Sequence, residues 1–183
     1  MRTYRTIIVA GVPIKLYGGP GLFAKGGLDK GTQLLIENIE FPSSGVVLDL
    51  ACGNGIIGIF IALVRKDLKV YMSDIDARAV ELAKLNARIN NVDDRTVVVE
   101  SDVYANLPKK MFSAIYSNPP LKAGWSVIER MICEGPEHLA GKGFMQFVFA
   151  KGWEKAVEIG KRCFSQAYIV KSKWGYKIVK YEL

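Results

Sequence analysis

The sequence is poor in the side chains that bind metals and form disulfides. It has three cysteines and one histidine in 183 residues, and no CxxC pair. Structural zinc sites need clusters of such ligands, so we expect no metal site. Cys52, Cys133 and Cys163 are far apart in the chain, and three unpaired thiols indicate a reducing compartment. His138 has no partner motif, and we expect it at the surface.

The chain also lacks long apolar runs. The longest apolar stretch, around Ile56 to Val64, is broken by Gly58 and is too short to cross a bilayer. Residues 1–10 lack the charged, apolar and cleavage regions of a signal peptide. We therefore expect a cytoplasmic protein that makes no membrane contact. The length, with a hydrophobic content of 50%, predicts a single domain over residues 1–183.

Basic charge is concentrated at the two ends of the chain. The formal net charge is +7. Residues 1–30 hold five Lys or Arg and one acid, and residues 151–183 hold eight and three, whereas residues 31–150 hold twelve and fourteen. Such charge attracts a polyanion, and RNA is the expected partner. Many soluble proteins are basic, so charge alone leaves other partners open.

The apolar pattern predicts a β-hairpin followed by strands that alternate with helices. The hairpin consists of Thr3–Val9 and Val12–Tyr17, and a glycine-rich loop follows it. The predicted helices are Thr32–Glu40 with Thr32 as its N-cap, Ile56–Arg65, a helix from Asp76 to Asn90, Trp125–Cys133 and Trp153–Cys163. The predicted strands are Val46–Leu50, Lys69–Ser73, Thr96–Glu100, Phe112–Tyr116, Phe144–Ala150, Gln166–Lys171 and Tyr176–Tyr181.

This alternation predicts an α/β fold with a mostly parallel, doubly wound sheet and helices on both faces. The last two of its seven strands are separated by about four residues, which is too short for a crossover helix, so that pair must be antiparallel. A parallel sheet that ends in an antiparallel strand differs from the plain dinucleotide-binding sheet. It resembles the Rossmann-like class I methyltransferase fold.

A glycine-rich turn follows the first strand of the alternation. Residues 53–58, GNGIIG, match G-x-G-x-x-G between a strand and a helix, and Asp74 ends the next strand. Glycines let backbone N–H groups approach a ligand closely, and the acid accepts hydrogen bonds from ribose hydroxyls. The motif alone fits both a dinucleotide and S-adenosylmethionine. Asp74 and Asp76 could instead cap the helix that follows them.

Three further features favour S-adenosylmethionine over a dinucleotide. Asp49 lies inside the strand, four residues before Gly53, where an anionic group can serve the methionine ammonium. Asp102 ends the third strand, where it can accept from an adenine amino group or be an ordinary turn residue. Asn118-Pro119-Pro120 ends the fourth strand, at the edge where open α/β sheets bind ligands.

Asn118 and Pro119 suit the chemistry of an exocyclic amine. Such an amine is a poor nucleophile, because its lone pair is delocalised into the ring. The Asn118 side-chain oxygen can accept one N–H and the Pro119 carbonyl the other, which turns the lone pair toward a sulfonium methyl. The methylated nitrogen becomes acidic, so no strong general base is needed. The alternative, a strand that ends in a rigid turn, explains the prolines but not the asparagine.

Several segments together resemble class I methyltransferases of the small-subunit ribosomal RNA guanine-N2 type. They are GLFAKGGLDKGTQLL (21–35), DLACGNGIIG (49–58), MSDIDARAVELAKLNA (72–87), SNPPLKAG (117–124) and KSKWGYKIVK (171–180). The chain is similar to the catalytic half of the longer members. The resemblance implies S-adenosylmethionine as cofactor, and ribosomal RNA or a ribosomal particle as substrate.

The resemblance also implies roles for individual residues. Residues 1–31 would form the hairpin and a loop that covers the cofactor. Asn118 and Pro119 would be catalytic, and Pro120, Leu121 and Lys122 would meet the substrate. The implied cofactor-binding residues are Phe23, Thr32, Asp49, Ala51, Gly53, Asn54, Gly55, Asp74, Ile75, Asp102 and Val103.

The sequence departs from this family at two positions. Leu121 stands where many amino-methyltransferases have an aromatic ring, and Lys122 stands where many relatives have histidine. Stacking of a base on an aromatic ring contributes about 1–3 kcal/mol. Trp125 or Phe23 could supply that ring, or the pocket could rely on shape.

Two other functions stay open. The first is a protein glutamine N-methyltransferase of the release-factor type, against which Leu121 and the lack of an N-terminal helical substrate domain argue. The second is a non-catalytic subunit with a methyltransferase fold, against which the intact Asp49, Gly53, Gly55 and Asn118 argue. The sequence does not identify the modified nucleotide or the oligomeric state.

Overall fold

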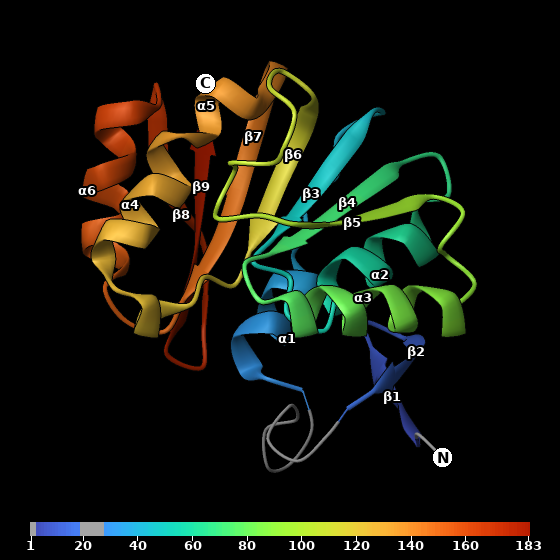
Figure 1. Ribbon diagram of the computed structural model, residues 1–183. Helices are drawn as coiled ribbons and strands as arrows, with labels where there is room; N and C mark the ends of the chain where they lie inside the picture. The colour runs from blue at the N-terminus through green and yellow to red at the C-terminus, as the bar shows by residue number, and fades with distance from the viewer. Residues whose placement is uncertain (1–2, 19–27) are drawn as a thin grey trace.

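A seven-stranded sheet forms the centre of the computed structural model, which describes residues 3–18 and 28–183. In space the strands follow the order β5-β4-β3-β6-β7-β9-β8 (Figure 1). Strands β3 to β7 are parallel, and β9 pairs antiparallel with both β7 and β8. The predicted class I methyltransferase fold is confirmed. The strands are β3 (Val46–Leu50), β4 (Lys69–Asp74), β5 (Thr96–Glu100), β6 (Phe112–Ser117), β7 (Leu139–Phe149), β8 (Gln166–Lys173) and β9 (Tyr176–Glu182).

Helices cover both faces of this sheet (Figure 1). One face carries α1 (Lys30–Glu37), α2 (Ile56–Val64) and α3 (Ala77–Ile89), and the other carries α4 (Trp125–Cys133) and α6 (Trp153–Cys163). A 3-10 turn, η1 (Leu121–Ala123), precedes α4, and the short α5 (Gly135–His138) follows it. Alternate strand residues fill two separate apolar cores, one on each face. No helix in residues 3–18 and 28–183 has the length and apolar character needed to cross a membrane.

The N-terminal hairpin is a second, two-stranded sheet. It consists of β1 (Tyr4–Val9) and β2 (Val12–Tyr17), which pair antiparallel as predicted. Asn86 of α3 holds the hairpin to the rest of the fold, because its Oδ1 accepts from the Tyr17 N–H at 2.7 Å. Its Nδ2 also donates to the Asn54 carbonyl at 2.9 Å. One buried amide therefore joins the hairpin, α3 and the glycine-rich turn.

Helix α1 begins earlier and ends earlier than predicted. The N-cap is Asp29, whose Oδ2 accepts from the Thr32 N–H at 2.9 Å. The prediction of Thr32 as the N-cap is wrong, because the carboxylate three residues upstream already caps its amide. The helix ends at Glu37, three residues before the predicted end at Glu40.

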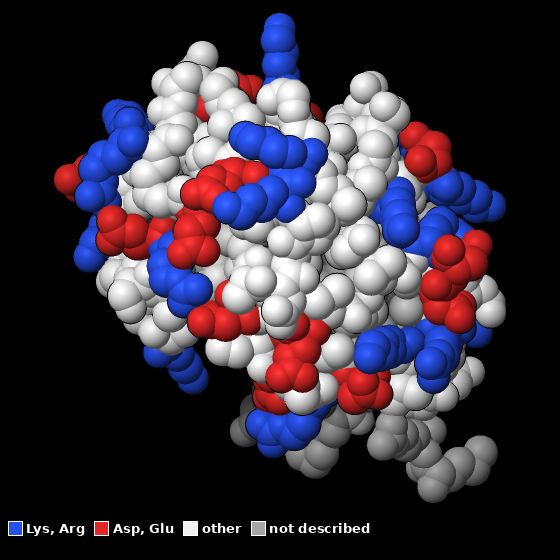
Figure 2. All heavy atoms as spheres, turned by 45° about the horizontal axis from the view of Figure 1, so that its top comes forward, with Lys and Arg blue, Asp and Glu red and all other residues white. Residues whose placement is uncertain are grey.

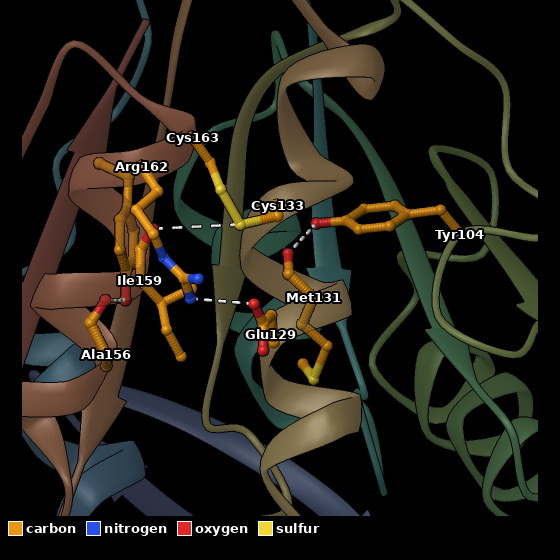
Figure 3. The surroundings of a disulfide bond; sticks show 9 residues. Tyr104, Glu129, Met131, Cys133, Ala156, Ile159, Arg162 and Cys163 are labelled. Atoms are coloured by element: carbon orange, nitrogen blue, oxygen red, sulfur yellow. Dashed lines mark hydrogen bonds and ion pairs between the residues drawn. A yellow bond between two sulfur atoms is a disulfide. The ribbon is translucent and has the colours of Figure 1, made fainter.

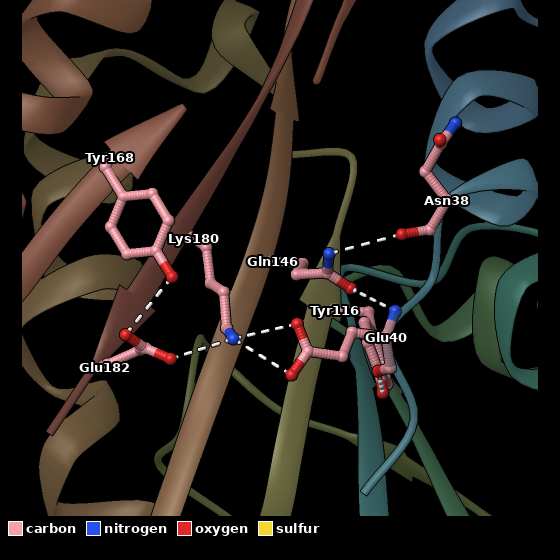
Figure 4. Close-up of polar contacts among 7 residues, drawn as sticks. All are labelled: Asn38, Glu40, Tyr116, Gln146, Tyr168, Lys180 and Glu182. Carbon is pink, nitrogen blue, oxygen red and sulfur yellow. Dashed lines mark hydrogen bonds and ion pairs between the residues drawn. The ribbon is translucent and has the colours of Figure 1, made fainter. Parts of the chain in front are cut away.

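A polar network fixes the chain that follows α1 (Figure 4). Lys180 of β9 is nearly buried, and its Nζ lies 2.8–2.9 Å from both carboxylate oxygens of Glu40 and 2.8 Å from Glu182. The Tyr116 hydroxyl donates to the Glu40 carbonyl, and the Glu40 N–H donates to Gln146. A buried ammonium needs such partners. The network therefore ties β6, β7 and β9 to the segment after α1.

A disulfide joins the ends of two helices. Cys133 at the end of α4 and Cys163 at the end of α6 are bonded, with their Cα atoms 5.3 Å apart (Figure 3). Arg162 and Glu129 form an ion pair of 2.9 Å between the same helices. The prediction of three unpaired thiols is therefore wrong for two of them, whereas Cys52 is free and buried.

Two further predictions differ from the structure near the start of β7. His138 is buried, not at the surface, because its Nδ1 lies 2.9 Å from the Pro108 carbonyl and its ring stacks on Tyr104 at 4.4 Å. Strand β7 begins at Leu139, not Phe144, because its first residues pair with Phe112 before a register shift.

Replacement of Asn86 with Ala is expected to lower the free energy of unfolding by about 1–3 kcal/mol. The Tyr17 N–H and the Asn54 carbonyl would lose their shared partner. Urea unfolding measures the change. Arg88→Ala on the exposed side of α3 is the matched control, with an expected change within about 0.5 kcal/mol. Equal losses in the two variants would show that Asn86 does not join these segments.

Candidate functional site

A cavity of about 400 Å³ lies at the carboxyl ends of the parallel strands β3, β4, β5 and β6. Each strand contributes its last residue or the residues just after it. The cavity is also closed by α4, which follows the η1 turn. Its lining residues are Leu50, Ala51, Gly53, Ser73, Asp74, Ile75, Ser101, Asp102, Val103, Asn118, Pro120, Ala123, Val127 and Met131.

Most of the predicted site residues lie in or beside this cavity. Eight of them line it, namely Ala51, Gly53, Asp74, Ile75, Asp102, Val103, Asn118 and Pro120. Seven others do not, namely Thr32, Asp49, Asn54, Gly55, Pro119, Leu121 and Lys122. Phe23 lies outside the described residues, as does most of the loop predicted to cover the cofactor.

The structure adds residues that sequence reasoning missed. Leu50, Ser73 and Ser101 line the cavity as neighbours of predicted residues at the same strand ends. Val127 and Met131 come from α4 and are four residues apart. Their spacing places both on one helix face, which is the signal that could have identified them.

Asp74 organises the glycine-rich turn. Its Oδ2 accepts from the Gly53 N–H at 2.9 Å, and its Oδ1 accepts from the Asp76 N–H at 3.0 Å. Asp76, not Asp74, is the N-cap of α3. Gly53 and Gly55 have φ angles of +54° and +83°, which glycine adopts without strain. The Asp74 carboxylate is therefore held at the cavity wall by two backbone donors, with lone pairs left for a ligand.

Two non-glycine residues of the cavity wall also have left-handed backbones. Ala51 has a φ of +58° and Val103 a φ of +53°. For a β-branched residue such as Val103 this is a true outlier. Strained backbone of this kind concentrates at ligand sites, where the surrounding structure holds it in place. Its presence after β3 and β5 makes this cavity a candidate functional site.

Asp49 is buried beneath the same turn. Its Oδ2 accepts from the Gly58 N–H at 2.9 Å, and its Oδ1 has no hydrogen-bond partner among the described residues. Burial, opposed by this hydrogen bond and aided by the nearby Asp74 charge, raises the pKa of Asp49 from 3.8 to about 7. A side chain at Gly58 would crowd this region, because its Cβ would lie 2.5 Å from the side chain of Met72 and 3.3 Å from Asp49 Oδ2.

Asp102 is held by an arginine from α4. Arg130 Nη1 lies 3.2 Å from both carboxylate oxygens of Asp102, and Arg130 Nε donates to Glu134 at 3.0 Å. These side chains are about half exposed. The ion pair orients the Asp102 carboxylate at the mouth of the cavity, where the sequence placed an acceptor for an adenine amino group.

The side-chain amide of Asn118 has a defined orientation. Its Nδ2 donates to Asp29 Oδ2 at 2.9 Å and to Thr32 Oγ1 at 3.0 Å. An ionised carboxylate only accepts hydrogen bonds, so the Asn118 NH₂ group must face Asp29. The Asn118 Oδ1 is thereby turned away from α1, and Asn118 is one of the residues that line the cavity. Sequence reasoning missed Asp29, although its position three residues before Thr32 is a capping signal.

Leu121 and Lys122 lie on the exposed η1 turn directly after the prolines. The Leu121 side chain is 37% exposed. Trp125 follows at the start of α4 and packs on Gly152, where a Cβ would meet its ring at 2.3 Å. Trp125 is the first aromatic residue after the Asn-Pro-Pro turn.

Comparison with known proteins identifies relatives of this chain. The family model "Methyltransferase small domain" matches residues 13–180. The chain is 35% identical to the uncharacterised protein YbxB of Bacillus subtilis, over 87% of this chain and 81% of that protein. It is 39% identical to ribosomal RNA small subunit methyltransferase C of Hamiltonella defensa, over 70% of this chain and 39% of that protein. It is 37% identical to the protein of the same name from Pseudoalteromonas atlantica, over 84% of this chain and 45% of that protein.

A solved structure shares the fold. The T. thermophilus 16S rRNA N2 G1207 methyltransferase, in complex with AdoMet and guanosine, superposes with a TM-score of 0.83 at 21% identity. The match covers 98% of this chain and 50% of that one. The chain therefore spans about half the length, or less, of the ribosomal RNA methyltransferases that it matches.

Asp49 is expected to make stability depend on pH. The unfolded carboxyl ionises near pH 4, whereas the folded one keeps its proton to about pH 7. Its contribution to the free energy of unfolding is therefore present below about pH 4 and is lost as the pH rises to about 7. The parent should therefore lose a few kcal/mol of the free energy of unfolding between about pH 4 and about pH 7, and Asp49→Asn should not show this loss.

Urea unfolding without cofactor at about pH 4.5 and about pH 7.5 tests this expectation. The other ionisable groups are common to both proteins, so the difference between them isolates Asp49. Parallel pH profiles for the two proteins would contradict the raised pKa.

Asp29→Asn is expected to separate capping from orientation of Asn118. Asparagine is as good an N-cap as aspartate, so the free energy of unfolding should change by less than about 0.5 kcal/mol. The new amide can donate as well as accept, so it no longer forces the Asn118 NH₂ group toward α1. Methyl transfer should slow by about tenfold or more while cofactor affinity stays unchanged. An unchanged rate would show that Asp29 acts only as a cap.

Proposed function

The chain belongs to the methyltransferase small domain family, and we propose that it methylates the exocyclic N2 amine of guanine in ribosomal RNA. The methyl donor is S-adenosylmethionine. The observation that carries the proposal is that Asn118 lines the cavity while its NH₂ group is held by Asp29 and Thr32, which leaves its side-chain oxygen as a free acceptor. A fixed acceptor of this kind recognises an N–H donor.

The cavity suits S-adenosylmethionine. A volume of about 400 Å³ lies within the range of small-molecule sites. Ser73 lines the cavity, and its buried Oγ has no partner among the described residues. Buried polar groups are rarely left unpaired, which supports a ligand with polar groups at this position. Ile75 lines the cavity and is 67% exposed, so it offers an apolar surface to an adenine ring.

The residues that would hold the cofactor follow from these contacts. Asp74, fixed by two backbone N–H groups, would accept from the ribose hydroxyls. Asp102 and the backbone of Val103 would meet the adenine, and Asp49 with Gly53 would lie along the methionine part. When bound, the cofactor supplies an electrophilic methyl group. Thr32, Asn54 and Gly55 do not line the cavity. Thr32 accepts a hydrogen bond from Asn118, the Asn54 carbonyl accepts one from Asn86, and Gly55 is the N-cap of α2.

Asn118 and Pro119 would hold the target amine. The Asn118 oxygen accepts one N–H and the Pro119 carbonyl accepts the other, which leaves the nitrogen lone pair free to face the cavity. The contribution of this pair is orientation and electrostatic stabilisation, without abstraction of a proton. The amine becomes acidic on methylation and then loses its proton to solvent.

The choice of guanine in ribosomal RNA rests on the relatives. Two acceptors fit an exocyclic NH₂, which adenine, cytosine and guanine all carry. Curated relatives are named ribosomal RNA small subunit methyltransferase C, and the T. thermophilus structure contains guanosine. The guanine amine of a duplex lies in the minor groove and is engaged in pairing. The enzyme should therefore act on a single-stranded or flipped-out nucleotide. A net charge of +7 favours RNA binding.

Asn118→Ala is expected to lower the rate of methyl transfer to RNA by about a hundredfold or more, because an amine acceptor is lost. Calorimetry should find nearly unchanged affinity for S-adenosylmethionine. Total RNA and total protein, each incubated with labelled cofactor, identify the substrate, and nucleoside mass spectrometry identifies the product. N2-methylguanosine is the expected product.

Other products have different consequences. N6-methyladenosine would retain the Asn118 mechanism and reject guanine. A 5-methylcytosine or ribose-methyl product would reject the mechanism. Transfer to protein and not to RNA would favour a glutamine N-methyltransferase, and transfer to neither would favour a non-catalytic subunit.

A further inference from the structure

All three tryptophans of the chain lie at one edge of the molecule. Trp125 begins α4, Trp153 begins α6, and Trp174 lies in the turn between β8 and β9. Both helices begin after the carboxyl end of a parallel strand, β6 and β7 respectively. The antiparallel register of β9 pairs Lys177 with Phe149, the last residue of β7, and so carries the turn past that same edge. Figure 1 shows the starts of α4 and α6 and the β8–β9 turn at the same end of the sheet. The residues that line the cavity lie at this end.

Each of these tryptophans has lysine over its ring. Lys155 Nζ lies 4.8 Å from the centre of the Trp125 ring, and Lys177 Nζ lies 5.4 Å from that of Trp153. Lys30 and Lys173 both approach the ring of Trp174. We call the three tryptophans and these four lysines the tryptophan–lysine rim. Alternating cationic and aromatic side chains are what single-stranded nucleic acid binds, because they meet phosphates and base faces in turn.

Trp174 is the most exposed of the three tryptophans. Lys173 Nζ lies 4.3 Å and Lys30 Nζ 4.6 Å from the centre of its ring, which is 43% exposed. Trp174 has a φ of +55° and Gly175 a φ of +81°, so both central residues of the turn are left-handed. Asparagine or glycine normally occupies the first position of such a turn. The Trp174 side chain is large and partly exposed, although it stands at a backbone position that is strained for any residue with a Cβ. Such backbone strain concentrates at functional sites, which points to a role of Trp174 in binding.

The rim is continuous with the Asn-Pro-Pro turn that carries Asn118. Lys30 is the residue after Asp29, which holds the Asn118 amide at 2.9 Å. Next to it, Gly31 packs so closely on Tyr176 that a Cβ would lie 2.8 Å from that ring. The β8–β9 turn therefore contacts the start of α1 beside Asn118. On the other side, Trp125 follows the η1 turn, which begins directly after Pro120.

The opposite edge has a different surface. Figure 2 brings forward the side of the molecule where the parallel strands begin, and basic and acidic side chains are interspersed over it. Lys142 lies near this side, in the first part of β7, and is exposed. It provides a matched control for the exposed lysines of the rim.

We propose that the tryptophan–lysine rim binds the single-stranded RNA that flanks the target nucleotide, with one base stacked on Trp174 and the lysines on phosphates. This inference rests on the proposed function and names the surface that presents the substrate to Asn118. Single-stranded RNA is the occupant that fits, because a duplex hides its base faces and leaves only the phosphates for the lysines. The lysine over a ring moves to a phosphate when a base takes its place.

Fluorescence anisotropy with a fluorescein-labelled single-stranded RNA and the full chain tests the proposal. Trp174→Ala should weaken binding by about 5- to 100-fold, and Trp174→Phe, which keeps a ring, by less than about threefold. Lys173→Ala should weaken binding and lower the salt dependence by about 0.7 in the log–log slope, whereas Lys142→Ala should change neither. Quenching of tryptophan fluorescence by the RNA should diminish in Trp174→Phe. Affinity for S-adenosylmethionine should be the same in all four variants.

Several outcomes would overturn the proposal. Equal RNA affinity of Trp174→Ala and the parent would do so, as would equal losses in Lys173→Ala and Lys142→Ala. Preference for the duplex form of the same RNA, or for polyglutamate over RNA, would also overturn it. If the parent methylates RNA in these cases, the proposed function stands and only the rim fails. If the parent methylates protein and not RNA, the proposed function itself fails.

Discussion

One carboxylate oxygen, Asp29 Oδ2, connects the start of helix α1 to the turn that carries Asn118. It accepts from the Thr32 backbone and from the Asn118 amide, each at 2.9 Å. The chain beyond the other end of α1 is held by Glu40 and the nearly buried Lys180 of β9. The helix is therefore fixed at both ends against the sheet. The orientation of the Asn118 amide therefore depends on contacts at both ends of α1.

The carboxyl edge of the sheet is also where the structure departs from ordinary packing. Ala51 and Val103 have left-handed backbones there, and Asp49 and Ser73 each have a buried oxygen without a partner among the described residues. Burial raises the pKa of Asp49 to about 7, so the ionised form is disfavoured until a cation or donor approaches. Strained backbone and unpaired buried polar atoms at this edge both support a ligand site there.

The helices on the second face bring the cavity and the tryptophan–lysine rim into one unit. Helix α4 carries Val127 on the cavity wall and begins with Trp125, while α6 begins with Trp153. The disulfide between Cys133 and Cys163 joins the far ends of these helices. A cross-link there limits how far the two tryptophans can move relative to each other.

The sequence by itself determined the elements, the sheet type and the strand-end motifs, because apolar periodicity and turn residues act over a few neighbouring positions. It therefore predicted Asp74, Asp102 and Asn118 at one edge. The hydrogen bond of Asp29 with Asn118, the ion pair of Asp102 with Arg130, the buried His138, the disulfide and the gathering of the tryptophans were decided by tertiary structure. Each joins residues that are distant in the chain. Such contacts depend on how helices pack across a twisted sheet, and no local pattern contains that geometry.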